Sequence, residues 1–205
     1  MIETQDRILQ KTDELFRKLG IRSVTLDEIA KELGISKKTI YQFFTDKDAL
    51  VDAVMMAEFE KNHEKCKCCS INSTNAVEEI FLLMKHIGED FRNLNPIIIY
   101  DMQKFHFKTF QKFQNHLHQN LRTMIAENLE RGIKEGLYRE TLDVEIIARF
   151  RMASIWVLFD PEVYPAEKFE IRKVFKETLE LFLFGLVSPK GYKLIEKYQQ
   201  QLNKK

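Results

Sequence analysis

Apolar residues near the N-terminus recur at helical spacing in short segments, each of which ends at a glycine. The first segment carries Ile8, Leu15, Phe16 and Leu19. The second segment carries Leu26, Ile29, Ala30 and Leu33. Residues at these spacings share one face of an α-helix, and glycine readily adopts the left-handed conformation that ends a helix. We therefore expect two short amphipathic helices that end at Gly20 and Gly34.

Polar residues mark where the next helices begin. The tetrad from Thr25 to Glu28 is a capping box, because the Thr25 hydroxyl can accept a first-turn amide while Glu28 reaches back. Ser36 can cap a third helix over residues 37–44, whose apolar positions share a face. Those positions are Ile40, Phe43 and Phe44. The N-terminal segment therefore predicts helix, tight turn and helix.

The rest of the chain keeps the helical pattern in longer segments. Thr45 with Asp48 repeats the capping signature, Asn75 can cap another helix, and Asn95 with Pro96 marks a further start. The expected helices cover residues 46–65, 76–91, 96–135 (one long or two broken helices), 144–159, 166–187 and a short segment from 189. With seven Gly and four Pro and no convincing strand, we expect an all-α fold with an N-terminal three-helix head on a larger helical body.

The composition indicates a folded chain and narrows its class. Of 205 residues, 44% are hydrophobic and 31% are charged, with 32 Lys and Arg against 31 Asp and Glu. This balance excludes a disordered chain and a uniformly basic one. The sequence has no run of 18 apolar residues, and its N-terminus lacks the basic start and apolar stretch of a signal peptide. We therefore expect a cytoplasmic protein without a membrane segment.

Two short helices joined by a glycine turn and braced by a third are the arrangement that places a helix in the DNA major groove. The face opposite Ile40 and Phe44 carries Lys37, Lys38, Tyr41 and Gln42. These side chains can contact phosphates and base edges, whereas the major groove of RNA would exclude the helix. Residues 1–50 hold nine basic and nine acidic residues, but residues 34–47 hold three lysines and one aspartate. The alternative, a helical hairpin with a solvated lysine face, leaves the spacing of the turn unexplained.

The segment over residues 24–50, VTLDEIAKELGISKKTIYQFFTDKDAL, resembles the DNA-binding head of the TetR family of transcriptional regulators. The resemblance covers about residues 7–52. It implies phosphate contacts at Thr25, Tyr41 and Lys47, and contacts with the groove at Lys37, Lys38, Thr39 and Gln42. The candidate DNA-binding residues are Thr25, Ser36, Lys37, Lys38, Thr39, Tyr41, Gln42 and Lys47. Two positions depart from the family pattern: Lys38 replaces a frequently small residue, and Phe43 replaces a common tyrosine.

The body holds more aromatic and methionine side chains than a minimal core needs. An apolar effector pocket can lie among them, although the same residues can simply fill a core. The candidate pocket residues are Phe81, Met84, Tyr100, Phe105, Phe110, Phe113, Met152 and Trp156. The resemblance implies that the last two long helices pair with their copies in a dimer, and residues 179–186 are apolar almost all round their helix. The candidate interface residues are Ile155, Phe159, Leu179, Phe182, Leu183 and Leu186.

One cluster suggests metal or redox chemistry. His63, Cys66 and Cys69 share a broad helical face, and imidazole with thiolates suits Zn or Cu(I). Cys68 points elsewhere on such a helix, so ordinary thiols at a helix end are the simpler interpretation. The three cysteines allow no disulfide framework, and no nucleophile elbow, phosphate-binding loop, dinucleotide fingerprint or zinc-protease motif indicates an enzyme or a cofactor.

These observations predict a homodimeric DNA-binding transcriptional regulator rather than an enzyme. Residues 1–47 form the expected DNA-binding domain, and residues 48–205 form the expected effector-binding and dimerisation domain. We expect a repressor that binds a palindromic double-stranded operator and that a small apolar effector releases, with no cofactor. The alternatives are a thiol- or metal-responsive regulator that senses through Cys66, Cys68 and Cys69, and a helical enzyme or carrier with a vestigial head.

Overall fold

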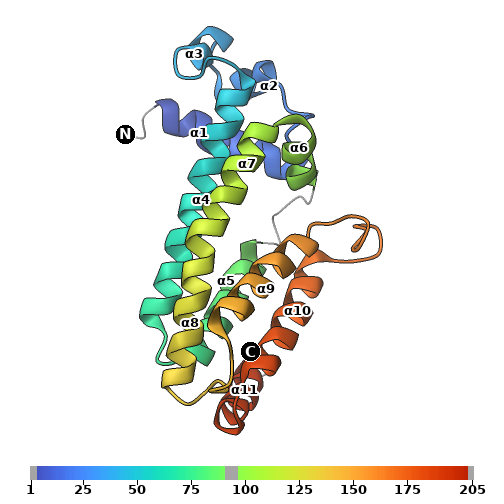
Figure 1. The fold of residues 1–205 in the computed structure, drawn as a ribbon. Helices are drawn as coiled ribbons and strands as arrows, with labels where there is room; N and C mark the ends of the chain where they lie inside the picture. The colour runs from blue at the N-terminus through green and yellow to red at the C-terminus, as the bar shows by residue number, and fades with distance from the viewer. Residues whose placement is uncertain (1–3, 91–96, 203–205) are drawn as a thin grey trace. The chain divides into compact units, whose positions relative to one another are not determined.

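The computed structural model describes residues 4–90 and 97–202, with side chains described for all of these except 90, 116, 117, 201 and 202. Within these ranges the regular structure is helical (Figure 1), and the β-type pairing consists of one isolated bridge between Tyr138 and Val187. The helices are α1 (Thr4–Leu19), α2 (Leu26–Leu33), α3 (Lys37–Tyr41), α4 (Lys47–Asn72), α5 (Ala76–Asp90), α6 (Ile97–Phe105), α7 (Phe107–His116), a π-helical turn (Leu117–Leu121), α8 (Arg122–Lys134), α9 (Val144–Val157), α10 (Ile171–Leu186) and α11 (Pro189–Leu202). The expected all-α fold is confirmed.

The chain forms two compact units. The first contains residues 1–62 and 93–116, and the second contains residues 63–92 and 117–205, so that α4 contributes to both. The first unit extends beyond the boundary expected at residue 47. Its extension is held by contacts from the head to later helices, among them an ion pair between Asp52 and Lys112 at 2.7 Å. None of the helices in the described ranges is long and apolar enough to cross a bilayer.

Helix α4 begins and ends differently from the expectation. Asp46 caps it, because its Oδ1 accepts the Ala49 N–H at 2.8 Å, so the expected cap by Thr45 is wrong. The helix continues to Asn72 rather than ending near residue 65, and the three cysteines lie inside it. The cap that follows is confirmed, since Asn75 Oδ1 accepts the Glu78 N–H at 2.9 Å at the start of α5.

The later boundaries also differ in part. The expected start at Asn95 and Pro96 lies outside the described residues. The expected start of α9 at Val144 is confirmed, and Asp143 caps the helix there, because its Oδ1 accepts the Ile146 N–H at 3.0 Å. Helix α10 begins at Ile171 instead of residue 166, since the carbonyl of Pro165 accepts N–H groups within a separate turn. The C-terminal helix α11 begins at Pro189 as expected and runs to Leu202.

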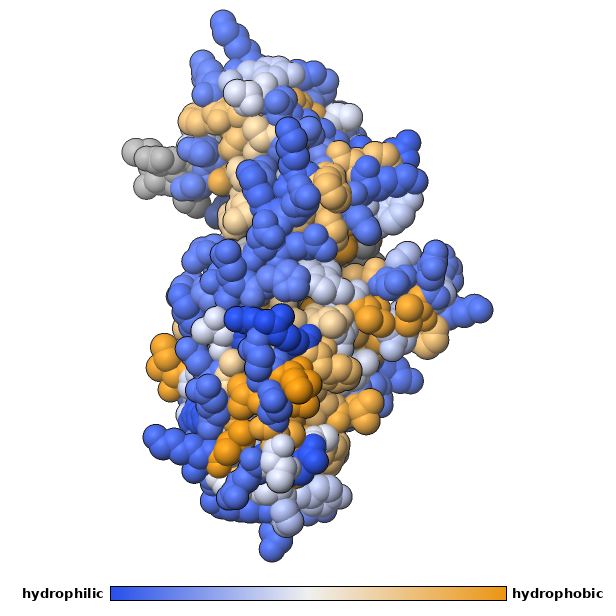
Figure 2. Space-filling model, viewed as in Figure 1, coloured by the Kyte–Doolittle hydropathy of each residue, from blue (hydrophilic) through white to orange (hydrophobic). Residues whose placement is uncertain are grey.

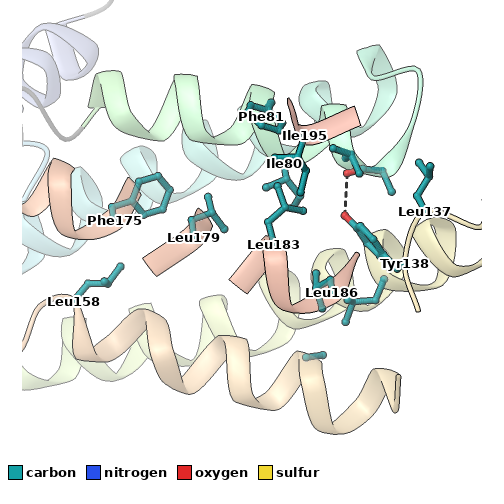
Figure 3. Close-up of a cluster of buried hydrophobic side chains, with 14 of the residues drawn as sticks. Ile80, Phe81, Leu137, Tyr138, Leu158, Phe175, Leu179, Leu183, Leu186 and Ile195 are labelled. Carbon is teal, nitrogen blue, oxygen red and sulfur yellow. Dashed lines mark hydrogen bonds between the residues drawn. The ribbon is translucent and has the colours of Figure 1, made fainter. Parts of the chain in front are cut away.

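The core of the second unit joins α5, α9, α10, α11 and the loop after α8 (Figure 3). Tyr138 lies at its polar edge, almost fully buried, and its hydroxyl has two acceptors for its one hydrogen, the Ala76 carbonyl at 3.2 Å and Asn128 Oδ1 at 3.0 Å. Burial raises the pKa of the Tyr138 hydroxyl above its ordinary value. A Cβ at Gly132 would lie 2.0 Å from the Tyr138 ring, so glycine is required where α8 passes the aromatic ring.

Candidate DNA-binding site and effector cavity

The turn between α2 and α3 has the local geometry that the sequence predicts. Thr25 accepts the Glu28 N–H at 3.2 Å, and Glu28 Oε2 accepts the Thr25 N–H at 2.8 Å, which completes the capping box. These bonds to the carboxylate lower the pKa of Glu28. At the other end of α2, Gly34 adopts φ 66°, and the Ile35 N–H reaches the Ala30 carbonyl at 3.0 Å. The helix, turn and helix are confirmed.

Helix α3 is short, and this changes the expected face. It ends at Tyr41 rather than at residue 44, and Gln42 is its C-cap. Ile40 and Phe44 are buried beneath the turn as expected, but Phe43 is 42% exposed. The expectation that Phe43 shares the apolar face of Ile40 and Phe44 is therefore wrong, because α3 ends before Phe43 and the helical register does not extend to it. Tyr41, Gln42 and Phe43 together form an exposed segment at the end of α3.

The candidate DNA-contacting side chains of α3 lie in distinct environments. Ser36 caps the helix by accepting the Thr39 N–H at 3.1 Å, and its hydroxyl lies 2.9 Å from the Thr39 hydroxyl. Lys37 is bound by Asp27 of α2 at 2.9 Å, a contact that raises the pKa of Lys37. Lys38 is exposed, and in the part of the chain that the structure describes no carboxylate pairs with it. Lys38 is therefore the lysine of α3 whose charge is available to another molecule.

Lys47 lies at the start of α4 and is half-buried. Its Nζ donates to the carbonyls of Ile21 and Arg22 at 2.7 and 3.4 Å, so it fixes the loop between α1 and α2. Burial lowers the pKa of the Lys47 ammonium, with nearby carboxylates, Asp101 first, opposing the shift. A contact between Lys47 and a DNA phosphate would add to this internal role or compete with it.

Sequence reasoning missed a residue of α6 that holds the same loop. Asp101 is buried, with 3% of its surface exposed, and its Oδ2 accepts the Arg22 N–H at 2.9 Å. Gly20, at φ 81°, brings the backbone so close to α6 that a Cβ would lie 2.8 Å from Ile97 Cγ2. The Arg22 guanidinium also lies 5.1 Å from the centre of the Phe105 ring. The sequence indicated the turn at Gly20, but no local pattern identified Asp101, which lies 79 positions after its partner Arg22.

The eight candidate pocket residues do not line one cavity. Tyr100, Phe105, Phe110 and Phe113 belong to the first unit, and Phe81, Met84, Met152 and Trp156 belong to the second. In the first unit Phe113 stacks on Phe59 with ring centres 3.9 Å apart, while Tyr100 and Phe105 are more than 40% exposed. In the second unit Phe81 is buried in the core, and Met152 and Trp156 line an open hollow of about 630 Å³ beside Arg122 and Arg149.

The second unit instead holds an apolar cavity of about 140 Å³ that none of those eight residues lines. Its walls come from α4, α5, the π-helical turn, α8, α9 and α10 together with Leu158, the residue that caps α9. Its polar side chains include Glu79, Asn128 and Arg151. Arg151 is 5% exposed, and burial lowers its pKa to about 10, so the guanidinium is still charged at neutral pH. We call this space the Arg151 cavity.

The placement of the candidate interface residues corrects the expectation for α10. Leu179, Leu183 and Leu186 are core residues of a single chain, each less than 5% exposed. Ile155, Leu179 and Phe182 line the Arg151 cavity, and Phe159 packs against the core. The sequence pattern identified apolar positions all round the helix but not which side meets the core. The exposed apolar side chains of α9 and α10 are Ile146, Phe150, Val157, Leu181 and Phe184. Figure 2 shows hydrophobic side chains gathered on the visible face around α9.

The cysteine cluster has no arrangement suited to a metal. Cys68 is exposed, Cys69 is buried, and Cys66 lines the Arg151 cavity, so the three thiols have separate surroundings. Burial raises the pKa of the Cys69 thiol, which disfavours the thiolate that metals and oxidants require. No group of three or more His, Cys, Asp or Glu side chains suited to a metal ion occurs among the residues with described positions. The structure therefore gives no support to a thiol or metal sensor.

Comparisons with known proteins find similarities for the N-terminal segment and for most of the chain. Residues 8–54 match the family model "Bacterial regulatory proteins, tetR family". The HTH-type transcriptional repressor KstR2 of Rhodococcus jostii (strain RHA1) is 26% identical over 179 residues, which cover 85% of this chain and 87% of that protein.

Two solved structures share the fold over most of both chains. The ketosteroid transcriptional regulator KstR2 of Mycobacterium tuberculosis matches with a TM-score of 0.59 at 22% identity, covering 92% of this chain and 97% of that one. FadR from Bacillus subtilis, solved in complex with stearoyl-CoA, matches with a TM-score of 0.66 at 20% identity, covering 87% and 97%. With the capping box, the Gly34 turn and the exposed end of α3, residues 8–54 match the DNA-binding head of the tetR family, and the chain is similar in sequence and fold to TetR-family transcriptional regulators.

Proposed function

We propose that this protein is a homodimeric repressor that binds a palindromic operator and leaves it when a small apolar effector occupies the second unit. The observation that carries the proposal is the exposed end of α3, where Lys38, Tyr41 and Gln42 lie beyond a completed turn. A cation, a phenol and an amide can contact phosphates and base edges in a major groove. The candidate DNA-binding residues keep the roles that the family resemblance implies, with residues 1–47 as the DNA-binding domain.

The effector role is supported by the Arg151 cavity and by the relatives. A TetR-family fold relative, FadR of Bacillus subtilis, was solved with stearoyl-CoA, and KstR2 of Mycobacterium tuberculosis is titled a ketosteroid regulator. An apolar cavity with few polar groups is the usual form of a small-molecule site. A ligand that binds better to the conformation without DNA would shift the protein away from the operator.

A palindromic operator is the DNA sequence that a two-fold symmetric dimer would bind. Successive major grooves on one side of DNA lie about 34 Å apart, so two heads of a dimer read two inverted half-sites. The chain passes between the units inside α4 and at the junction of α7 with the π-helical turn, and these continuous connections can carry a change from the effector domain to the head. A shift of a few ångströms in head separation would misplace one recognition helix.

The test is footprinting of the purified protein on the DNA that flanks its own gene, followed by anisotropy titrations with the protected segment. We expect protection of an inverted repeat and an affinity that falls steeply with salt. Apolar compounds should then be screened for release of the labelled DNA. Protection of no site, with only weak and sequence-independent binding, would contradict the proposal.

A further inference from the structure

The Arg151 cavity contains one charged group whose surroundings do not balance it. Arg151 lies on α9, 5% exposed, and lines the cavity together with Phe182 of α10. Its guanidinium lies over the Phe182 ring, 5.2 Å from the ring centre. Its Nη1 donates to Ser154 Oγ at 3.3 Å, and among the side chains that the structure describes no carboxylate forms an ion pair with it. A guanidinium has five N–H donors, and the one side-chain hydrogen bond to Ser154 leaves donors of this cavity-lining residue for another acceptor.

The other charged group of the cavity wall shows the contrast. Glu79 is 3% exposed, and Arg131 lies 3.3 Å from its Oε2. Arg131 also donates to Ser73 Oγ at 2.8 Å and binds Glu135 at 2.8 Å, so it belongs to a network that closes that side of the unit. The carboxylate of Glu79 is thus paired with the cation of Arg131, whereas the guanidinium of Arg151 contacts only neutral groups among those described, the Phe182 ring and the Ser154 hydroxyl. Burying a cation without an anion is unfavourable, and the folded chain bears that cost before anything binds.

We propose that the Arg151 cavity binds a small apolar carboxylate, with the carboxylate on the Arg151 guanidinium and the hydrocarbon among the apolar walls. The inference rests on the proposed function and names the chemical class of its effector. A carboxylate can accept two parallel N–H bonds from a guanidinium, and it meets a cation that is already desolvated. Ile80, Leu83, Ile125 and Phe175 provide the apolar walls.

The cavity volume limits the hydrocarbon. A cavity of about 150 Å³ lined by apolar side chains accommodates a benzene ring. The Arg151 cavity, at about 140 Å³, therefore suits an acid with one aromatic ring or a chain of about six carbons. A coenzyme A thioester is far larger than this space, so the free acid and the thioester are separate arms of the test.

The experiment uses calorimetric titration of the full-length protein without DNA at pH 7.5. The ligands are benzoate and hexanoate, their neutral counterparts benzamide and hexanamide, and hexanoyl-CoA. We expect each free acid to bind at least about tenfold more tightly than its amide, which corresponds to one charge-assisted bond. The preference should disappear in Arg151→Met and persist in Arg149→Met. Arg149 is the matched control, because it lies on the same helix with 65% of its side chain exposed and pairs with Glu145.

Three results would overturn the carboxylate site: equal binding of acid and amide, an acid preference that survives in Arg151→Met, and an equal loss in Arg149→Met. Binding of hexanoyl-CoA alone would overturn the free acid as the occupant. If Arg151→Met does not fold, Arg151→Lys replaces it, because lysine keeps the charge but not the paired donors. The preference for the acid over the amide should then fall. An unchanged preference in Arg151→Lys would overturn the site. Anisotropy with operator DNA separates the two proposals, since an acid that binds without releasing DNA refutes the effector role alone.

Discussion

The three lysines of the recognition segment differ in what already holds them. Lys37 pairs with Asp27, and Lys47 donates to two backbone carbonyls of the loop before α2. Lys38 has no carboxylate partner among the described side chains. In the sequence the three lysines look equivalent. In the structure only the ammonium group of Lys38, of these three, has no partner among the described residues and is available to a phosphate. We therefore expect the electrostatic part of the proposed DNA binding to depend most on Lys38.

Replacement of Lys38 by alanine tests this assignment. We expect Lys38→Ala to weaken binding to the operator and to unrelated DNA by similar factors, and to reduce the slope of log affinity against log salt by about 1. The free energy of unfolding of Lys38→Ala should stay within about 0.5 kcal/mol of the wild type, since the side chain is exposed. Lys193→Ala makes the same charge change in the second unit and should leave the slope unaltered. An unchanged slope in Lys38→Ala would remove Lys38 from the interface.

A substitution at Gln42 tests whether a single side chain of α3 recognises a DNA base. Its amide is exposed at the C-cap of α3, where it can donate to and accept from a base edge. We expect Gln42→Ala to cost about 1–3 kcal/mol on the operator and to relax the preference at one position of each half-site. Binding of a set of single-base operator variants measures this. Equal losses on every sequence would show that Gln42 contacts only the backbone.

At the scale of elements, the loop between α1 and α2 is held from two helices. Its Arg22 N–H is bound by Asp101 of α6, and its carbonyls are bound by Lys47 of α4. This loop leads directly into the capping box of α2, so its position sets where the head begins. Helix α6 thus contributes to the head although it lies some 80 residues later in the chain.

The contribution of α6 can be measured with Asp101. We expect Asp101→Ala to lower the free energy of unfolding by about 1–3 kcal/mol, because a buried N–H loses its acceptor. Operator affinity should fall with it, since the start of α2 is less firmly placed. Asp101→Asn keeps an acceptor oxygen and should recover most of the stability in urea denaturation. If both variants were as stable as the wild type, the bond to Arg22 would not matter for the head.

The elements that sequence could predict are those with local signals. The capping box at Thr25, the left-handed Gly34 and the Asn75 cap each involve atoms a few positions apart, and the structure has all three. The length of α4 and the start of α10 depend on contacts with other elements, and both expectations missed by five residues or more. A helical pattern states that a residue is apolar, not which neighbour covers it.

The candidate site divides in the same way. The exposed end of α3 followed from local pattern, except at Phe43, where the helix ends sooner than its apolar spacing indicates. The pocket did not follow, because large aromatic residues such as Phe81 and Phe113 are attractive candidates whatever they pack against. Arg151 was missed for the opposite reason: like Arg149 two positions earlier, an arginine on a helix looks like a solvent-facing residue until its burial is known.

At the scale of the whole molecule, the apolar surface of α9 and α10 bears on assembly. On α9, Ile146, Phe150 and Val157 recur at helical spacing on one exposed face, and on α10 Leu181 and Phe184 do the same. Leu181 is 75% exposed and Phe150 is 61% exposed. Exposed apolar side chains gathered on adjacent helices mark a surface that another protein covers. We expect this partner to be a second copy of the chain, as the proposed palindromic operator would require.

Substitution on that surface tests the dimer and its need for DNA binding together. We expect Phe150→Glu with Leu181→Glu to shift the protein from dimer to monomer in sedimentation experiments, because four carboxylates per dimer would meet in an apolar interface. The monomer should keep its helical circular dichroism, since both residues are exposed. It should also lose most of its operator affinity, because each head then binds one half-site alone.

The matched control is Ile71→Glu on α4, where the isoleucine is 80% exposed and lies outside the α9 and α10 surface. It places a carboxylate on an equally exposed apolar residue and should leave both the dimer and operator binding intact. Dissociation by Ile71→Glu would mean that the interface involves α4. A double variant that remained dimeric would exclude the α9 and α10 surface, and a monomer with full operator affinity would show that two-fold symmetry is not needed for recognition.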